Sequence, residues 1–420
     1  MRWTERDVWT CATSMGLDPF PTEFHTVPAH VLYDIAARGM PGRYSYWGYG
    51  KDYFHEITRH EHGLGRIYEL VINANPSQAF LLDANSDVIN LMVMTHVLGH
   101  TDFFKHNRTF ADTCRDMPDR AALRAERIRQ YEERYGLDAV EQTLDALLAL
   151  EFYVDPDGYT PQHPVLDKES PEKDRATQRR FAGLPCRDVL GFLIAEAPLD
   201  DWQKDIGSIV REDGLYFWPQ IRTKTINEGW ASFWHGKLMH ELDLSDGEFM
   251  EFAKINAGVV CCHPGALNPY WLGLNILADI EHRHGRERLF QVRRLETDSS
   301  LVRNYLTREL VEELGLIRYG FKGDAVVVTE DNWESIRDTL ANDFCARFPE
   351  IQVADRDYGG TGGLLLEHVY DGRPLKQRSA FKVLEHIHSL WRRPVYLQTL
   401  EAGKSVVWYY DGRTTGSRSV

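Results

Sequence analysis

The segment from residue 86 to 104 limits the possible folds more than any other feature. It reads SDVINLMVMTHVLGHTDFF and is apolar nearly all round, which is typical of a helix buried in a protein core. Periodic patterns predict further helices, which span residues 121–135, 137–152, 186–197, 200–217, 225–242 and 268–284. We therefore expect most of residues 24–305 to be helical.

The pattern changes after about residue 315. Short β-branched or aromatic runs at 325–329, 395–399 and 405–410 predict strands, and Asp371-Gly372 predicts a hairpin turn. A chain of 420 residues is too long for one ordinary core. The prediction is a mainly α protein with a large helical domain over 1–310, compatible with a zincin-peptidase-like core, and a smaller α+β domain over 315–420.

Charge and patterning exclude several classes of protein. The chain has 48 basic and 63 acidic residues, a net charge of −15, which argues against broad binding of nucleic acid. Six cysteines without a CxxC pair support neither a zinc ribbon nor a thioredoxin-like site. The sequence has no secretory signal and no apolar run long enough for a membrane span, so we expect a cytoplasmic protein.

Two histidines in the apolar helix are the first candidate metal ligands. His96 and His100 are four residues apart, so both lie on one face of a helix and can chelate one ion. Zinc peptidases use this spacing with a glutamate directly after the first histidine, but Val97 stands there. The alternative is that both histidines are core residues with backbone hydrogen bonds.

The segment 227–235, NEGWASFWH, offers two more ligands. On a helix Glu228 and His235 share a face, and together with His96 and His100 they predict a site for a divalent transition metal. Three nitrogens and one carboxylate favour zinc, with iron or manganese as alternatives. The competing interpretation of Glu228 is a capping box with Thr225 as the N-cap.

Other polar residues are candidates for catalysis or substrate binding. Glu212 is a candidate general base, with an ordinary ion pair as its alternative, and His235 is a second candidate for moving protons. Arg43 and Lys51 lie in a loop rich in glycine and aromatic residues that could bind an anionic or sugar-like ligand, or pack as a surface loop. Asn107 continues the polar face of His96 and His100.

Several long blocks together resemble the SpoVR family (stage V sporulation protein R-like). They are HVLYDIAARGMPGRYSYWGYGK at 30–51, IYELVINANPSQAFLLDANS at 67–86, HVLGHTDFFKHN at 96–107, IVREDGLYFWPQIRTKTINEGWASFWH at 209–235, NPYWLGLNILADIE at 268–281 and LWRRPVYLQTL at 390–400. The resemblance implies a link to spore cortex (peptidoglycan) formation and to a stress-response module. It also implies two partners, an AAA-type serine kinase and a von Willebrand A-domain protein.

Two functions follow as hypotheses. In the first, the chain is a metal-dependent hydrolase acting on an amide or peptide bond, with His96, His100 and Glu228 holding the metal and Glu212 or His235 moving protons. In the second, it is a non-catalytic regulatory or scaffold partner of the kinase module. Val97 in place of glutamate favours the second hypothesis, and the polar faces on two apolar helices favour the first.

Overall fold

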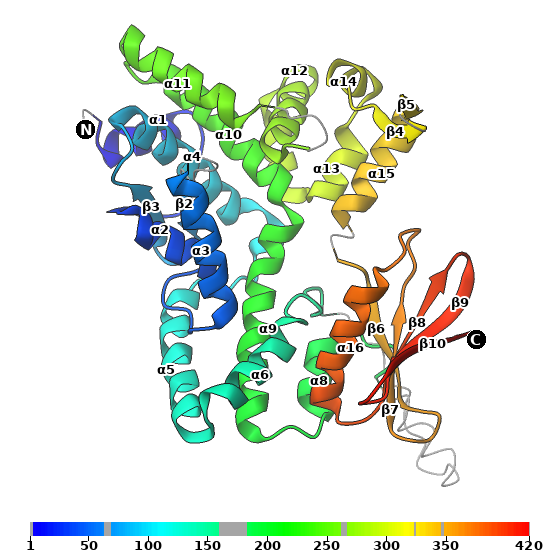
Figure 1. The fold of residues 1–420 in the computed structure, drawn as a ribbon. Coiled ribbons are helices and arrows are strands. Elements are labelled where there is room, and N and C mark those ends of the chain that lie inside the picture. Colours follow the sequence, from blue (N-terminus) through cyan, green and yellow to red (C-terminus); the bar gives the residue numbers. More distant parts are fainter. Residues whose placement is uncertain are drawn as a thin grey trace, which may run out of the picture. The chain divides into compact units, whose positions relative to one another are not determined.

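The computed structural model describes residues 3–62, 69–158, 183–261, 267–322, 325–345 and 348–419. The prediction of a mainly α protein with a smaller C-terminal α+β part is confirmed (Figure 1). The chain forms two compact units: unit 1 comprises Met1–Leu123 and Pro219–Cys345, and unit 2 comprises Arg124–Trp218 and Ala346–Val420. Each unit combines two separate stretches, whereas the sequence predicted continuous domains over 1–310 and 315–420.

Unit 1 is built around helices, with two small sheets. Its elements in chain order are α1 (Glu5–Ser14), β1 (Thr22–Val27), α2 (Ala29–Arg38), α3 (Trp47–Glu61), β2 (Glu69–Ile72), β3 (Ser77–Leu82), α4 (Asp87–His106), the 3-10 helix η1 (Arg108–Phe110), α10 (Lys224–Glu241), α11 (Asp246–Val259), α12 (Pro269–Leu295), α13 (Asp298–Tyr305), α14 (Arg308–Glu313), β4 (Arg318–Lys322), β5 (Ala325–Glu330) and α15 (Trp333–Cys345). Helices α5 (Met117–Tyr135) and α9 (Asp201–Arg222) contain two of the three boundaries between the units, and the third follows Cys345.

Helix α4 is the buried helix that the apolar segment predicts. It starts where the Ser86 hydroxyl accepts a hydrogen bond from the Ile89 N–H, and it is buried along nearly its whole length. Helix α10 packs against both α4 and α12, so it lies in the middle of the core. Its N-terminal N–H groups at Thr225 and Ile226 donate to the carboxylate of Asp298.

Small residues allow α10 to approach both neighbours closely. A Cβ atom added to Gly99 of α4 would lie 2.8 Å from the Cα of Ala231 in α10. One added to Gly229 of α10 would lie 2.4 Å from the backbone carbonyl carbon of Gly273 in α12. Since backbone atoms cannot move aside as a flexible side chain can, these glycines set the spacing of the three helices.

Gly229→Ala is expected to lower the free energy of unfolding by about 2–3 kcal/mol, because the new methyl group overpacks the contact of α10 with α12. Gly236 provides a matched control on the same helix, because no atom lies within 4 Å of an added Cβ there. Gly236→Ala should raise stability by about 0.5–1 kcal/mol through its helix propensity. Urea denaturation followed by circular dichroism measures both changes, and equal effects would contradict the packing argument.

A three-stranded sheet lies beside the helices of unit 1. Its strand order is β1-β3-β2, with β1 parallel and β2 antiparallel to the central strand β3. The sequence predicted that most of residues 24–305 are helical, a range that includes most of this sheet. Strand β3 is buried at five of its six positions, and periodicity alone cannot tell such a run from a buried helix. The edge strand β2 begins at Glu69.

Unit 2 combines a five-stranded sheet with helices. Its remaining elements are α6 (Leu137–Leu148), α8 (Val189–Glu196), β6 (Ile351–Tyr358), β7 (Gly363–His368), α16 (Gln377–Trp391), β8 (Val395–Glu401), β9 (Lys404–Tyr410) and β10 (Thr415–Ser419). The predicted hairpin at Asp371-Gly372 is wrong: the chain continues from β7 into α16 and returns as β8, parallel to β7. Parallel neighbours require a crossover, and α16 provides it.

Within the part of the chain that the structure describes, no helix is both long and apolar enough to cross a membrane.

Candidate metal centre

Four potential metal ligands from three elements converge in unit 1. His96 and His100 extend from α4, Glu228 from α10 and Glu69 from the edge strand β2, and their ligand atoms all lie within 4.8 Å of one another. Both histidines are buried, with 4% and 5% of their side chains exposed, while 15% of Glu228 and 19% of Glu69 is exposed. The carboxylates therefore form the more accessible side of the cluster.

The spacing of these atoms suits a four-coordinate ion. His96 Nε2 lies 3.0 Å from Glu69 Oε1 and 3.6 Å from Glu228 Oε2. His100 Nε2 lies 3.6 Å from Glu69 Oε1 and 3.4 Å from Glu228 Oε2. Tetrahedral ligands at ordinary zinc–nitrogen and zinc–oxygen bond lengths lie about 3.3 Å apart, so the four separations bracket the expected value.

A chain of hydrogen bonds places a proton on Nδ1 of His96. His235 Nε2 lies 2.8 Å from the amide oxygen of Asn256, which can only accept, so this ring nitrogen carries a proton. The other ring nitrogen of neutral His235, Nδ1, must then accept from His96 Nδ1 at 2.7 Å. His96 Nδ1 is therefore the donor. The other ring nitrogen, Nε2, faces the two carboxylates and can offer a lone pair to a cation once it has lost its proton.

Asn227 orients the second histidine in the same way. Its amide oxygen accepts a hydrogen bond from His100 Nδ1 at 2.9 Å, so His100 Nε2 points to the carboxylates. Asn227 directly precedes Glu228 on α10, and one turn of helix therefore provides both a ligand and the group that orients another ligand.

The charges of the cluster stabilise one another. Burial raises the pKa of Glu228, but His100 and His96 beside it outweigh burial and lower that pKa to about 2. The pKa of Glu69 is also lowered, because the two imidazoles outweigh its burial. Burial lowers the pKa of His100, but the two carboxylates raise it to about 10. Both carboxylates are therefore ionised at neutral pH, and a bound metal would displace protons from the imidazoles.

Two buried atoms support a cation at this place. His96 Nε2 and Glu228 Oε2 make no hydrogen bond of normal geometry to the described residues, although each lies near an opposite charge. Each atom has an ion-pair partner but no well-directed hydrogen bond, and a shared metal ion would bond to both atoms. Two imidazole nitrogens and two carboxylate oxygens fit zinc, iron or manganese.

His235 lies outside the set of converging ligands, although the sequence predicted it as one. Both of its ring nitrogens are engaged, with His96 and with Asn256, which leaves no lone pair for a metal. Burial and the charge of His96 lower its pKa to about 3, so it stays neutral. The alternative capping box at Glu228 is wrong: the N-cap of α10 is Thr223, whose side chain makes no capping hydrogen bond, and the carboxylate of Asp298 accepts from the Thr225 and Ile226 N–H groups instead.

The other predicted site residues lie elsewhere. Glu212 belongs to unit 2 and forms an ion pair with Arg124, which matches the alternative given for it. Asn107 donates from Nδ2 to the carbonyls of Arg293 and Glu296, so it has a structural role.

The two predicted substrate-binding cations differ in exposure. Arg43 is buried, donates to the carbonyl of Arg38 and stacks over the ring of Tyr49. Lys51 is exposed on α3. Neither belongs to the cluster of converging ligands.

Sequence reasoning missed Glu69, Asn227, Asn256 and Tyr270. The ring of Tyr270 lies beside the cluster, with its centroid 6.1 Å from that of His96, and the pKa of its phenol is raised by burial and by the charges of Glu228 and Glu69. One signal for Glu69 was available, since it is a lone acidic residue in the apolar run YELVI. Asn256 and Tyr270 carry no such signal, because only the packing of α11 and α12 brings them near α10.

Comparisons with known proteins confirm the family resemblance of the sequence blocks. The family model described as SpoVR like protein matches residues 1–174 and 160–347, and the one described as SpoVR-like C-terminal domain matches residues 349–402. A protein of Escherichia coli (strain K12) named "Uncharacterized protein YcgB" is 28% identical to this chain over an alignment of 450 positions, gaps included. The alignment covers 91% of this chain and 88% of that protein. No solved structure gives a significant match.

Proposed function

The chain belongs to the SpoVR family, and on this premise we propose that it is a metal-dependent hydrolase acting on an amide or peptide bond. The observation that supports this most is the pair of imidazoles whose Nε2 atoms are both directed at two ionised carboxylates. The link of the family to peptidoglycan makes a peptide of a cell-wall precursor the substrate to test first.

His96, His100 and Glu228 are the residues that would hold the metal. A divalent ion in this position would polarise a carbonyl group and lower the pKa of a water molecule. Asn227 and His235 keep the two imidazoles in the tautomers that ligation requires.

Glu69 takes the place of the general base that the helix lacks. Zinc peptidases carry this glutamate directly after the first histidine, where Val97 is fully buried in the core. The carboxylate of Glu69 reaches the same cluster from β2 and is the most exposed of the four side chains. Tyr270 stays protonated because its pKa is raised, so it can donate a hydrogen bond to an oxyanion.

A second candidate function rests on the four-ligand geometry. When four protein ligands close a tetrahedron, the site is usually structural and leaves no position for water. Glu69 would then be the fourth ligand, and the chain would be a non-catalytic scaffold. Its partners would be the AAA-type serine kinase and the von Willebrand A-domain protein that the family resemblance suggests.

Glu69→Gln separates the two functions. In the hydrolase, the variant should keep its metal and its melting temperature, and hydrolysis should fall by about 10²–10⁴-fold because the general base is lost. Metal content is measured by elemental analysis, and hydrolysis by mass spectrometry of peptidoglycan stem peptides incubated with the protein. Glu61→Gln, an exposed site on α3, is the matched control and should behave as wild type.

The scaffold function gives a different result for the same variant. Loss of a fourth ligand should then lower the metal content and the melting temperature together, and wild type should cleave none of the peptides. Wild type that lacks a stoichiometric transition metal after purification without chelator would contradict the hydrolase and a structural metal site, and would leave a scaffold without a metal.

A further inference from the structure

A cavity of about 380 Å³ lies within unit 2. It is lined by strands β6, β7 and β8, by helix α16, and by residues from α8 and from the segment that follows α6. This volume falls in the range of about 300–1,000 Å³ that is usual for small-molecule sites. None of the residues used for the proposed hydrolysis lines it.

Most of the lining is aliphatic. Leu366 and Leu397 face it from the sheet, and Leu384 and Ile387 face it from α16. These four side chains are buried, so the walls belong to the core of the unit and are preformed. An apolar ligand body would lose water contact here without requiring the protein to rearrange.

Two polar groups of the lining have unused hydrogen-bonding capacity. His368 is 5% exposed and uses Nδ1 in a contact of 2.9 Å with the Thr399 hydroxyl, while its Nε2 makes no hydrogen bond to the described residues. The phenol of Tyr153 likewise makes none within the described chain, and burial raises its pKa. A ligand with a polar atom could satisfy either group.

The exposed rim of the cavity attracts negative charge. Lys376 and Ser379, both exposed, line it at the start of α16, and this helix has neither a side-chain cap nor an acidic residue in its first turn. The positive end of the helix dipole therefore adds to the charge of Lys376. The one carboxylate in the lining, Asp371, is neutralised by Arg373, with Oδ2 and Nη2 2.5 Å apart.

We propose that this cavity binds a small amphiphile, with an apolar body between the sheet and α16 and a single carboxylate at Lys376 and the α16 N-terminus. The apolar walls account for the body and the basic rim accounts for the head group. This site is independent of the metal centre, so one can fail without the other.

Isothermal titration of the full chain with decanoate tests the proposal, after treatment with chelator to prevent binding of the carboxylate to a metal. Wild type should bind one decanoate per chain. Lys376→Glu should weaken binding by about tenfold or more, because an attractive charge becomes repulsive. Ala380→Trp, which fills the cavity, should abolish binding.

Two controls make the outcomes decisive. Decanol lacks the charge, so Lys376→Glu should leave its affinity unchanged, and circular dichroism must show that both variants are folded. Lys376 is exposed, so its substitution tests the head-group site even if the tryptophan variant does not fold. No binding of decanoate by wild type, or equal binding by wild type and folded Ala380→Trp, would overturn the proposal.

Discussion

His100→Ala is expected to remove the metal from the purified protein, with a loss of affinity greater than 100-fold. The substitution deletes one of the two imidazoles proposed as ligands and leaves the amide oxygen of Asn227 without its donor. Changes to groups that only orient a ligand typically cost about 10–100-fold in metal affinity, so the ligand itself should cost more. Elemental analysis and competition with a chromophoric zinc chelator measure the two quantities, stoichiometry and affinity.

A graded series makes this prediction specific. Asn227→Ala should fall between wild type and His100→Ala, because it frees the ring of His100 without deleting it. His106→Ala changes another histidine of α4 that lies outside the cluster, and it should keep the full metal content. Equal metal content in wild type and His100→Ala would show that the metal, if present, is bound elsewhere.

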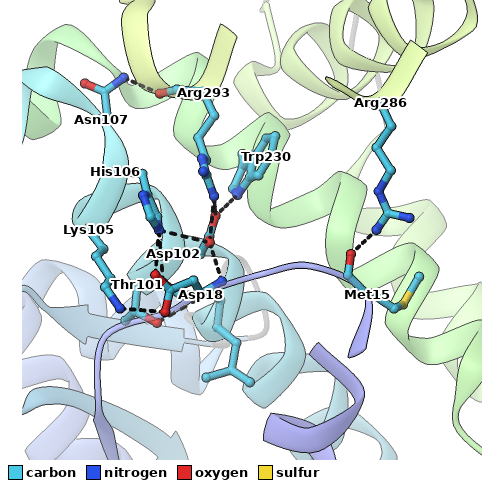
Figure 2. A network of polar contacts seen from close by, with 11 residues as sticks. Met15, Asp18, Thr101, Asp102, Lys105, His106, Asn107, Trp230, Arg286 and Arg293 are labelled. Atoms are coloured by element: carbon cyan, nitrogen blue, oxygen red, sulfur yellow. Dashed lines mark hydrogen bonds and ion pairs between the residues drawn. The ribbon is translucent and has the colours of Figure 1, made fainter. Parts of the chain in front are cut away.

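Asp102→Asn is expected to lower the free energy of unfolding by about 3–5 kcal/mol, the usual effect of removing one partner from a buried ion pair. The Asp102 carboxylate is fully buried, and each of its oxygens lies 2.8 Å from Arg293 Nη1 (Figure 2). It also accepts from the Trp230 indole at 2.9 Å and from the Asp18 N–H at 2.8 Å. One side chain thus joins α4, α10, α12 and the segment after α1.

The asparagine variant keeps the shape of this side chain but leaves Arg293 buried with its charge uncompensated. Urea denaturation measures the loss, and Glu312→Gln, which breaks the exposed pair with Arg308, should show no measurable change. The double variant Asp102→Asn with Arg293→Gln should lose less than the sum of the single variants, since the two residues are coupled. A loss below about 1 kcal/mol for Asp102→Asn would contradict a role as a buried ion pair, because an ordinary hydrogen bond contributes about that much.

Local periodicity explains which parts of the fold were predictable. The buried helix α4 and the shared face of His96 and His100 follow from the helical repeat, which depends only on neighbours in the chain. The predicted helix over 268–284 likewise begins within one residue of α12, whose first turn holds Pro269, a residue suited to that position. The hairpin at Asp371-Gly372 was predicted wrongly. A turn signal shows only that the chain bends, and it does not show whether the following segment is a strand that pairs with the preceding one.

The metal centre was predictable only in part. By itself the sequence determined the family and the mainly α fold, and it predicted three of the four candidate ligands, His96, His100 and Glu228. Only the tertiary structure decided that Glu69 lies beside them and that His235 orients His96 and is not itself a candidate ligand. It also decided that Glu212 belongs to unit 2, whereas the cluster belongs to unit 1. Ligands on one helix are placed by backbone geometry, whereas the approach of β2 and α11 to that helix depends on packing between segments far apart in the chain.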